Sequence, residues 1–271
     1  MSYTVNEKAR LAMESLLDSC ELVSGYSGGK KVEENYTAYF APETMWYNRV
    51  YIHAAENETL ETTVSAVAAG VREGKLPPLI SWLSTEVSSK AIRPFVKAEG
   101  YINPLPVQEA MFLDLEGYTP AAPTATVEHV SADKVGEWAD TIAAAFGKPT
   151  ERDGMVLIAA DEHCDFLVHY EEGKMVAGML LICVGDNAGV HEVATMEACR
   201  GKGIASSLMN CAMAIAKEKG CKYATLQASP MGAPLYENKT IGKDTLAGVF
   251  FLVQSLFICY TIPNKRRRYL R

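Results

Sequence analysis

The sequence predicts an α/β (α+β) protein built from two domains. The chain has 271 residues, which exceeds the ~250 residues at which a single core usually stops growing. Strand and helix patterns alternate through both halves, and a segment rich in Pro and small residues, 116–124, separates them. The apolar content of 48% and the charged content of 22% are ordinary for globular proteins and exclude a collagen-like or disordered chain.

The first half begins with a helix predicted over residues 5–18. Aromatic and β-branched residues then predict strands over 35–41 and 47–54. A second helix follows, because four apolar residues form one helical stripe: Leu60, Val64, Val67 and Val71. Three further elements complete this half, a strand over 79–83, a helix over 88–98 and a strand over 107–115.

The second half predicts a similar order of elements. They are a strand over 126–130, a helix over 132–146, a hairpin that pairs 166–170 with 175–184, and a strand over 190–195. The hairpin turn contains Gly173, which can adopt the positive φ that such turns need. We place the linker at 118–124, which assigns residues 1–117 to the first domain and 125–271 to the second.

Acidic charge over most of the chain narrows the classes of partner. The formal net charge of −7 becomes −12 when five basic residues near the end are set aside, Lys265, Arg266, Arg267, Arg268 and Arg271. An acidic body disfavours nucleic-acid binding and favours a cationic amine substrate. The first residues carry no export signal, which predicts a cytoplasmic protein. The seven cysteines are scattered without a C-x-x-C pair, so neither a metal site nor a disulfide is predicted.

A glycine-containing loop between a strand and a helix predicts an anion site. The strand 190–195 leads into Arg200-Gly-Lys-Gly-Ile-Ala205, and a helix that ends before Gly220 follows. The start of a helix presents unpaired N–H groups and the positive end of its dipole. Gly201 and Gly203 lack the Cβ atoms that would hold a pyrophosphate away, and Arg200 and Lys202 add positive charge. A tight turn with solvated basic residues would explain the same pattern.

The residues after that helix make the pattern more specific. A strand over 222–229 leads to Pro230-Met-Gly-Ala-Pro234 and then to Tyr236. With Arg200, Gly203 and Ala205 in the signature R/Q-x-x-G-x-G/A, the chain resembles the GNAT superfamily of acyl-CoA-dependent N-acyltransferases. The first half resembles the degenerate first copy of a two-domain bacterial GNAT arrangement. This resemblance implies two tandem GNAT-like domains, each a mixed, mostly antiparallel, twisted sheet flanked by helices.

The resemblance also implies the cofactor and the roles of individual residues. Acetyl-CoA would bind with its pantetheine arm along Val193, Ala194 and Thr195, and coenzyme A would leave as the product. Its pyrophosphate would lie at Arg200, Gly201, Lys202, Gly203, Ile204, Ala205 and Ser206. Tyr236 would be the general acid, and Glu192 or His191 on the same strand the base. Each has a plain structural alternative, which is a packing aromatic for Tyr236, a solvated strand residue for Glu192 and a hydrogen-bonded core residue for His191.

Several functional alternatives stay open on the sequence alone. We expect an N-acetyltransferase that acts on a primary amine of a small molecule or an amino terminus, and the main alternative is a non-catalytic acyl-CoA sensor. A homodimer is compatible with either. The apolar run 246–262 predicts two buried strands divided at Gln254–Ser255, while a membrane anchor would make the chain a membrane-attached adaptor. An altered reading frame at this end is a third explanation.

Overall fold

The computed structural model describes residues 3–54, 59–83, 89–101, 108–229, 232–233, 236 and 251–260. The chain forms two compact units, each built from two stretches of sequence. The large unit comprises Met1–Ser19 and Glu109–Val253, and the small unit comprises Cys20–Gln108 and Gln254–Arg271. The linker predicted at 118–124 falls within the sequence range of the large unit, and the domains 1–117 and 125–271 stay a prediction.

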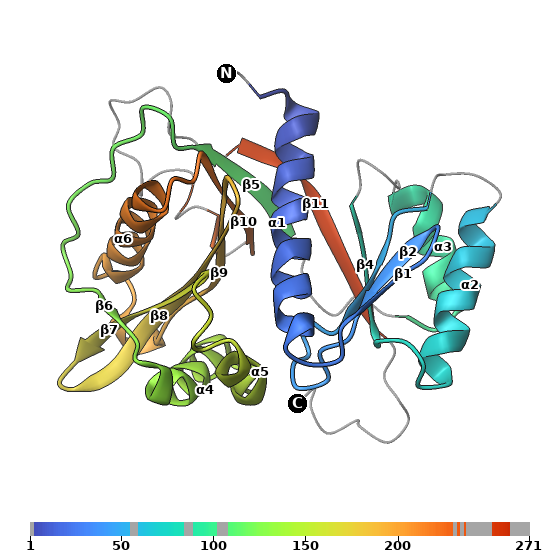
Figure 1. The fold of residues 1–271 in the computed structure, drawn as a ribbon, viewed down its shortest axis with the longest axis horizontal. Coiled ribbons are helices and arrows are strands. Elements are labelled where there is room, and N and C mark those ends of the chain that lie inside the picture. Colours follow the sequence, from blue (N-terminus) through green and yellow to red (C-terminus); the bar gives the residue numbers. More distant parts are fainter. Residues whose placement is uncertain are drawn as a thin grey trace. The chain divides into compact units, whose positions relative to one another are not determined.

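The small unit is a mixed sheet with the helices α2 and α3 and the last part of α1. Its strands lie in the order β1 (Lys30–Val32), β2 (Tyr36–Tyr39), β3 (Arg49–Ile52), β4 (Leu79–Leu83) and β11 (Phe251–Tyr260). Only β3 and β4 run parallel among these pairs. The helices α2 (Thr59–Arg72) and α3 (Ser89–Ala98) lie on the same side of the strands (Figure 1). The predicted stripe of α2 is confirmed, because Leu60, Val64 and Val67 are buried in the core of this unit.

The apolar run near the end of the chain differs from the prediction. Two strands divided at Gln254–Ser255 were expected, but Phe251–Tyr260 is one strand that runs through both residues. It pairs antiparallel with β4, from Leu256 beside Leu83 to Tyr260 beside Leu79. The rest of the predicted run, 246–250 and 261–262, lies outside the described residues. Within the described chain, no helix is both long enough and apolar enough to cross a membrane.

The large unit carries the second sheet. Its strands lie in the order β5 (Gln108–Asp114), β10 (Tyr223–Ala228), β9 (Asn187–Thr195), β8 (Lys174–Val184), β7 (Cys164–Glu171) and β6 (Glu128–His129). Only the β9–β10 pair is parallel among the described pairs. The helices are the first part of α1 (Val5–Gly25), α4 (Val135–Phe146), α5 (Arg152–Leu157) and α6 (Ile204–Glu218). Both units therefore confirm the predicted α/β (α+β) class with mixed, mostly antiparallel sheets.

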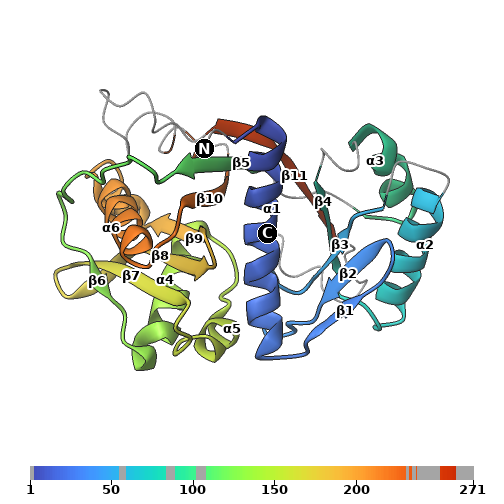
Figure 2. The ribbon, with the colours of Figure 1, turned by 45° about the horizontal axis from the view of Figure 1, so that its top comes forward.

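Alternating side chains of β7 show how helices cover both faces of the large sheet. Phe166 packs edge-on against Trp138 of α4, with ring centroids 4.9 Å apart. The next residue, Leu167, points to the other face and joins the core beneath α6 that contains Leu208 and Met209. Figure 1 and Figure 2 show α6 and α4 on opposite sides of these strands. The predicted β7–β8 hairpin is also confirmed, and its turn has positive φ at Glu172 and Gly173.

Candidate functional site

The strands β9 and β10 separate at their carboxyl ends. Their parallel pairing joins Asn187–Val190 to Tyr223–Leu226 and goes no further, although β9 continues to Thr195 and β10 to Ala228. On the other side of β9, the register with β8 shifts between His191 and Ala194. Glu192, inside this bulge, has a φ of 54°, which is unusual for a residue with a side chain. The last residues of β9 therefore have backbone groups that no β10 strand pairing uses.

The loop after β9 places a row of N–H groups at the start of α6. Gly201 and Gly203 both have a left-handed backbone, with φ of 78° and 79°. The N–H of Ser207 donates to the oxygen of Gly203 at 3.0 Å and so begins the helical hydrogen-bond pattern. The N–H groups of the residues before it, Ile204 to Ser206, precede that pattern and point along the helix axis. This backbone can bind an anion without help from a side chain.

The two basic side chains of the loop bind to the protein itself. Arg200 donates from Nε to the oxygen of Thr195 at 3.0 Å and from Nη2 to the oxygen of Ala145 at 3.1 Å. Lys202 donates from Nζ to both carboxylate oxygens of Glu171, at 2.9 and 2.8 Å. Arg200 thus ties the loop to the end of β9 and to α4. The carboxylate of Glu171 balances the positive charge expected from Lys202. No local sequence pattern indicates this pair, because Glu171 lies on another strand.

Ser207 fixes the loop to the segment that precedes β6. Its Oγ accepts hydrogen bonds from the N–H groups of Thr124 and Ala125, both at 3.0 Å. A Cβ at Gly203 would lie 3.3 Å from Oγ1 of Thr124, so this approach also leaves little room for a side chain there. In the described part of the chain, Oγ1 of Thr195 is buried and has no hydrogen-bond partner. A buried hydroxyl of this kind can form a hydrogen bond with a ligand group.

Tyr236 packs in the apolar core of the large unit. Its side chain is 7% exposed and belongs to the cluster that contains Leu226, Ala228 and Ala233. Burial raises the pKa of the Tyr236 phenol well above its ordinary value. The hydroxyl consequently keeps its proton at neutral pH.

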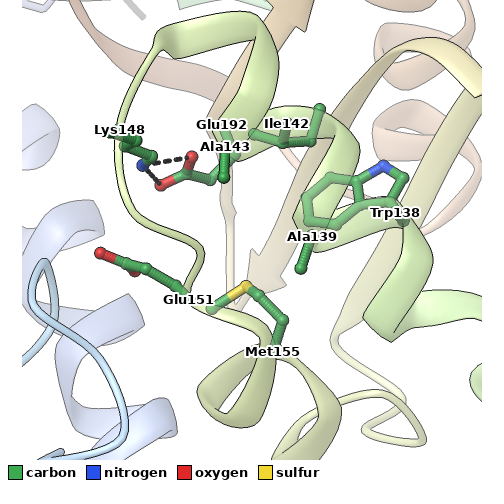
Figure 3. A pocket seen from close by; sticks show the side chains of 8 residues that line it. All are labelled: Trp138, Ala139, Ile142, Ala143, Lys148, Glu151, Met155 and Glu192. Carbon is green, nitrogen blue, oxygen red and sulfur yellow. Dashed lines mark hydrogen bonds and ion pairs between the residues drawn. The ribbon is translucent and has the colours of Figure 1, made fainter.

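Glu192 opens onto a small pocket beneath α4 and α5. Nζ of Lys148 donates to both of its carboxylate oxygens, at 2.9 and 3.2 Å, and Figure 3 shows this pair beside Glu151. The pocket is lined by Trp138, Ala139, Ile142, Ala143, Lys148, Glu151, Met155 and Glu192. Burial acts most strongly on the pKa of Lys148 and would lower it, but the Glu192 and Glu151 carboxylates outweigh burial and raise that pKa. Lys148 lies 44 residues away from Glu192 in the chain, so no local sequence pattern indicates that the two side chains pair.

His191 lies in different surroundings from its neighbour Glu192. A Cβ at Gly189 would lie 2.6 Å from Nε2 of His191 and 2.6 Å from Oγ of Ser15 on α1, so the ring lies over Gly189 on the α1 side. His191 is 6% exposed. Of the two predicted bases, Glu192 is the one that lines the pocket.

Part of this chain matches a known family, and its fold is similar to that of solved structures. Residues 134–238 match the model of the family described as "Acetyltransferase (GNAT) family". The fold is similar to a GCN5-related N-acetyltransferase from Kribbella flavida, with 15% identity, a TM-score of 0.59 and 94% of each chain covered. It is also similar to a GCN5-related N-acetyltransferase from Sphaerobacter thermophilus, with 16% identity, a TM-score of 0.57, and 96% of this chain and 93% of that chain covered. No curated protein sequence matches significantly.

Proposed function

We propose that the chain transfers an acetyl group from acetyl-CoA to a primary amine of a small molecule or an amino terminus, and the match of residues 134–238 to the acetyltransferase (GNAT) family supports this proposal. The observation that carries this proposal is the separation of β9 from β10, which leads directly into the glycine loop at the start of α6. Such a separation leaves room for an extended ligand to lie beside β9. The loop offers an anion site where that ligand would end.

The residues present fit coenzyme A. Acetyl-CoA, when bound, supplies the acyl thioester. The backbone of Val193, Ala194 and Thr195 would hold the pantetheine arm, and the buried Thr195 hydroxyl is available to it. The N–H groups of Gly201, Lys202, Gly203, Ile204, Ala205 and Ser206 would hold the pyrophosphate. Arg200 would act by positioning the loop through its bonds to Thr195 and Ala145.

Two side chains are placed to move protons. Glu192 lines the pocket on the β9 side and would take a proton from the attacking amine at its carboxylate. Tyr236 holds a proton on Oη because burial raises its pKa. We infer that this proton is given to the departing sulfur. The two roles are opposite, since the carboxylate of Glu192 would accept a proton and the buried phenol of Tyr236 would donate one.

The test is a pair of measurements on the full-length protein. Calorimetry measures acetyl-CoA binding, and release of the free thiol measures turnover with a panel of primary amines. We expect saturable binding and amine-dependent thiol release. Binding without thiol release for any amine, including peptides with free amino termini, would favour an acyl-CoA sensor. Absence of acetyl-CoA binding would contradict the proposed site.

A further inference from the structure

Two cysteine side chains meet in the core of the large unit, near the end of α6. Cys183 lies on β8, and Cys221 lies in the connection between α6, which ends at Glu218, and β10, which begins at Tyr223. Both belong to the same apolar cluster, and each is 7% exposed. Both are free cysteines, and the thiol of Cys183 donates a hydrogen bond to the sulfur of Cys221.

The small side chains of the intervening strand let the two sulfurs approach. In the sheet, β9 lies between β8 and β10, and its Ala188 pairs with Cys183 on one side and with Ala224 on the other. Side chains of directly paired residues lie on the same face of a sheet. Because both alanines are small and buried, this face has space for a contact between sulfurs across β9. Cys221 precedes β10, so strand pairing does not fix its backbone.

The surroundings of the pair favour a thiolate at Cys221 over one at Cys183. The hydrogen bond from Cys183 lowers the pKa of Cys221, and the Lys219 ammonium adds to this effect, while burial and the Asp186 carboxylate oppose it. The same hydrogen bond, together with burial, raises the pKa of Cys183. A thiolate is the form of cysteine that acts as a nucleophile. Cys221 can therefore react first, with a protonated thiol beside it.

We propose that Cys221 and Cys183 form a redox modification site, at which hydrogen peroxide converts the two thiols into a disulfide. The Cys221 thiolate attacks one peroxide oxygen, so that an S–O bond forms, the O–O bond breaks and the departing hydroxide takes up a proton to become water. The Cys183 sulfur then attacks the Cys221 sulfur, the S–O bond breaks, and the Cys183 proton leaves with the hydroxyl group as a second water. The two thiols lose two electrons, and the peroxide gains them.

Two other cysteines of the large unit provide a comparison within the same protein. Burial, with the carboxylates of Asp161 and Asp165, raises the pKa of the Cys164 thiol to about 12. Burial is also the main cause that raises the pKa of Cys211 on α6. Both thiols should therefore stay protonated and react slowly with peroxide. The proposal thus requires Cys221 to be oxidised before Cys164 and Cys211.

The test treats the fully reduced, full-length protein with hydrogen peroxide in the absence of denaturant. Free thiols are then alkylated, and peptide mass spectrometry identifies the cysteines that have been oxidised. We expect a disulfide between Cys183 and Cys221 that dithiothreitol reverses. Cys211→Ser is the matched control and should form this disulfide at the rate of the wild type. The proposal is overturned if this disulfide does not form, forms only in urea, or appears after oxidation of Cys164 or Cys211.

Single variants test the order of the two steps. Cys183→Ser keeps a hydrogen-bond donor toward Cys221 but cannot form the disulfide, so it should accumulate a sulfenic acid at Cys221 that dimedone traps. In Cys221→Ser, we expect Cys183 to be oxidised at least about tenfold more slowly than Cys221 is in Cys183→Ser. Equal rates in the two variants would overturn the assignment of Cys221 as the nucleophile. These outcomes are independent of the proposed acetyl transfer, because no step uses acetyl-CoA.

Discussion

At the scale of single residues, burial explains why the phenol of Tyr236 stays protonated, which its position in the sequence alone does not show. The side chain is buried among apolar residues, which raises the pKa of its phenol because the charged form would lose its hydration. A phenol that stays neutral can donate a proton to a departing sulfur, but it contributes little to the binding of a neutral thioester. The catalytic role and the packing role of Tyr236 can therefore be separated by measurement.

We expect Tyr236→Phe to lower turnover about 10²-fold, toward the lower end of the range for general acid catalysis, because a thiolate is a fairly good leaving group. Acetyl-CoA affinity should change by no more than the loss of one neutral hydrogen bond, about 0.5 to 1.5 kcal/mol. Steady-state kinetics and calorimetry measure the two effects. Tyr223→Phe is the matched control, since Tyr223 lies at the other end of β10 against Phe112 and should keep full turnover. Full turnover of Tyr236→Phe would transfer the proton donation to water.

The contacts of Glu192 show what a sequence pattern leaves out at this scale. Alternation along a strand correctly separates His191 from Glu192, because neighbouring side chains point to opposite faces. It does not predict the positive φ of Glu192 or its pairing with Lys148, 44 residues away. Both depend on how β9 and α4 come together. Lys202 with Glu171, 31 residues apart, is a second case of the same kind.

At the scale of elements, the loop between β9 and α6 connects two features. The end of β9 is not paired with β10, and the start of α6 presents N–H groups that precede its helical hydrogen bonds. Substitution of Gly203 tests this loop poorly, because its φ of 79° and the 3.3 Å approach to Thr124 would strain any side chain. Ser206 is a better position. It is the third residue of α6 and is partly exposed, so a longer side chain can be accommodated.

We expect Ser206→Glu to leave the thermal midpoint unchanged or raise it, because a carboxylate in the first turn of a helix stabilises by about 0.3 to 1 kcal/mol. The same carboxylate should weaken acetyl-CoA binding by at least about tenfold, since it would repel the pyrophosphate at close range. Thermal unfolding and calorimetry measure the two opposite effects. Ser206→Gln, of similar size but neutral, is the control and should bind acetyl-CoA more tightly than Ser206→Glu. Equal affinity of both variants would remove α6 from the phosphate site.

The sequence predicted elements well where one local signal was sufficient. The stripe of α2, the β7–β8 hairpin and the start of α6 after Gly203 each follow from periodicity or from a glycine with positive φ. The family assignment of residues 134–238 is confirmed as well. The single strand β11 was predicted as two strands divided at Gln254–Ser255, although a strand tolerates both polar residues. The bulge in β9 has no local signal, since it depends on register with β8.

At the scale of the whole molecule, several buried acids bind their protons more tightly in the folded state. Burial, with nearby carboxylates, raises the pKa of Cys164 from 9.0 to about 12, and burial raises the pKa of Tyr223 from 10.0 to about 12. The pKa of Tyr236 is raised as well, whereas the pKa of Cys221 is lowered. A raised folded pKa contributes stability that is complete below the unfolded pKa and is lost as pH rises toward the folded pKa.

We therefore expect the free energy of unfolding to stay level from about pH 7 to 8.5 and to fall above about pH 9. Each such group adds a slope of at most about 1.4 kcal/mol per pH unit. Urea unfolding at a series of pH values measures this loss. Cys164→Ala removes one of these transitions and should make the fall of the curve between about pH 9 and 10 less steep. An unfolding free energy that is constant to pH 10.5 would contradict the assignment of these groups as buried and protonated.

The two units should differ in whether they bind acetyl-CoA, because the glycine loop at the start of α6 belongs to the large unit, whereas the sequence between β3 and α2 in the small unit has no glycine. In the small unit, β3 ends at Ile52 and α2 begins at Thr59, and residues 53–58 between them read His-Ala-Ala-Glu-Asn-Glu. That connection contains two acidic residues and lacks glycine. Glu61 adds a third acidic residue in the first turn of α2. Carboxylates at a helix start occupy the place that a pyrophosphate would need and repel it.

We consequently expect calorimetry to give one acetyl-CoA bound per chain, with the active fraction of the protein established by an independent titration. Ser206→Glu should weaken this binding by at least about tenfold without exposing a second site, since the sequence that connects β3 to α2 in the small unit is acidic and has no glycine. Glu61→Gln is the matched control in that unit, and it should leave both the stoichiometry and the affinity unchanged because no cofactor contacts α2. A stoichiometry of two, or residual binding to Ser206→Glu that Glu61→Gln strengthens, would show that the small unit binds acetyl-CoA despite its acidic connection.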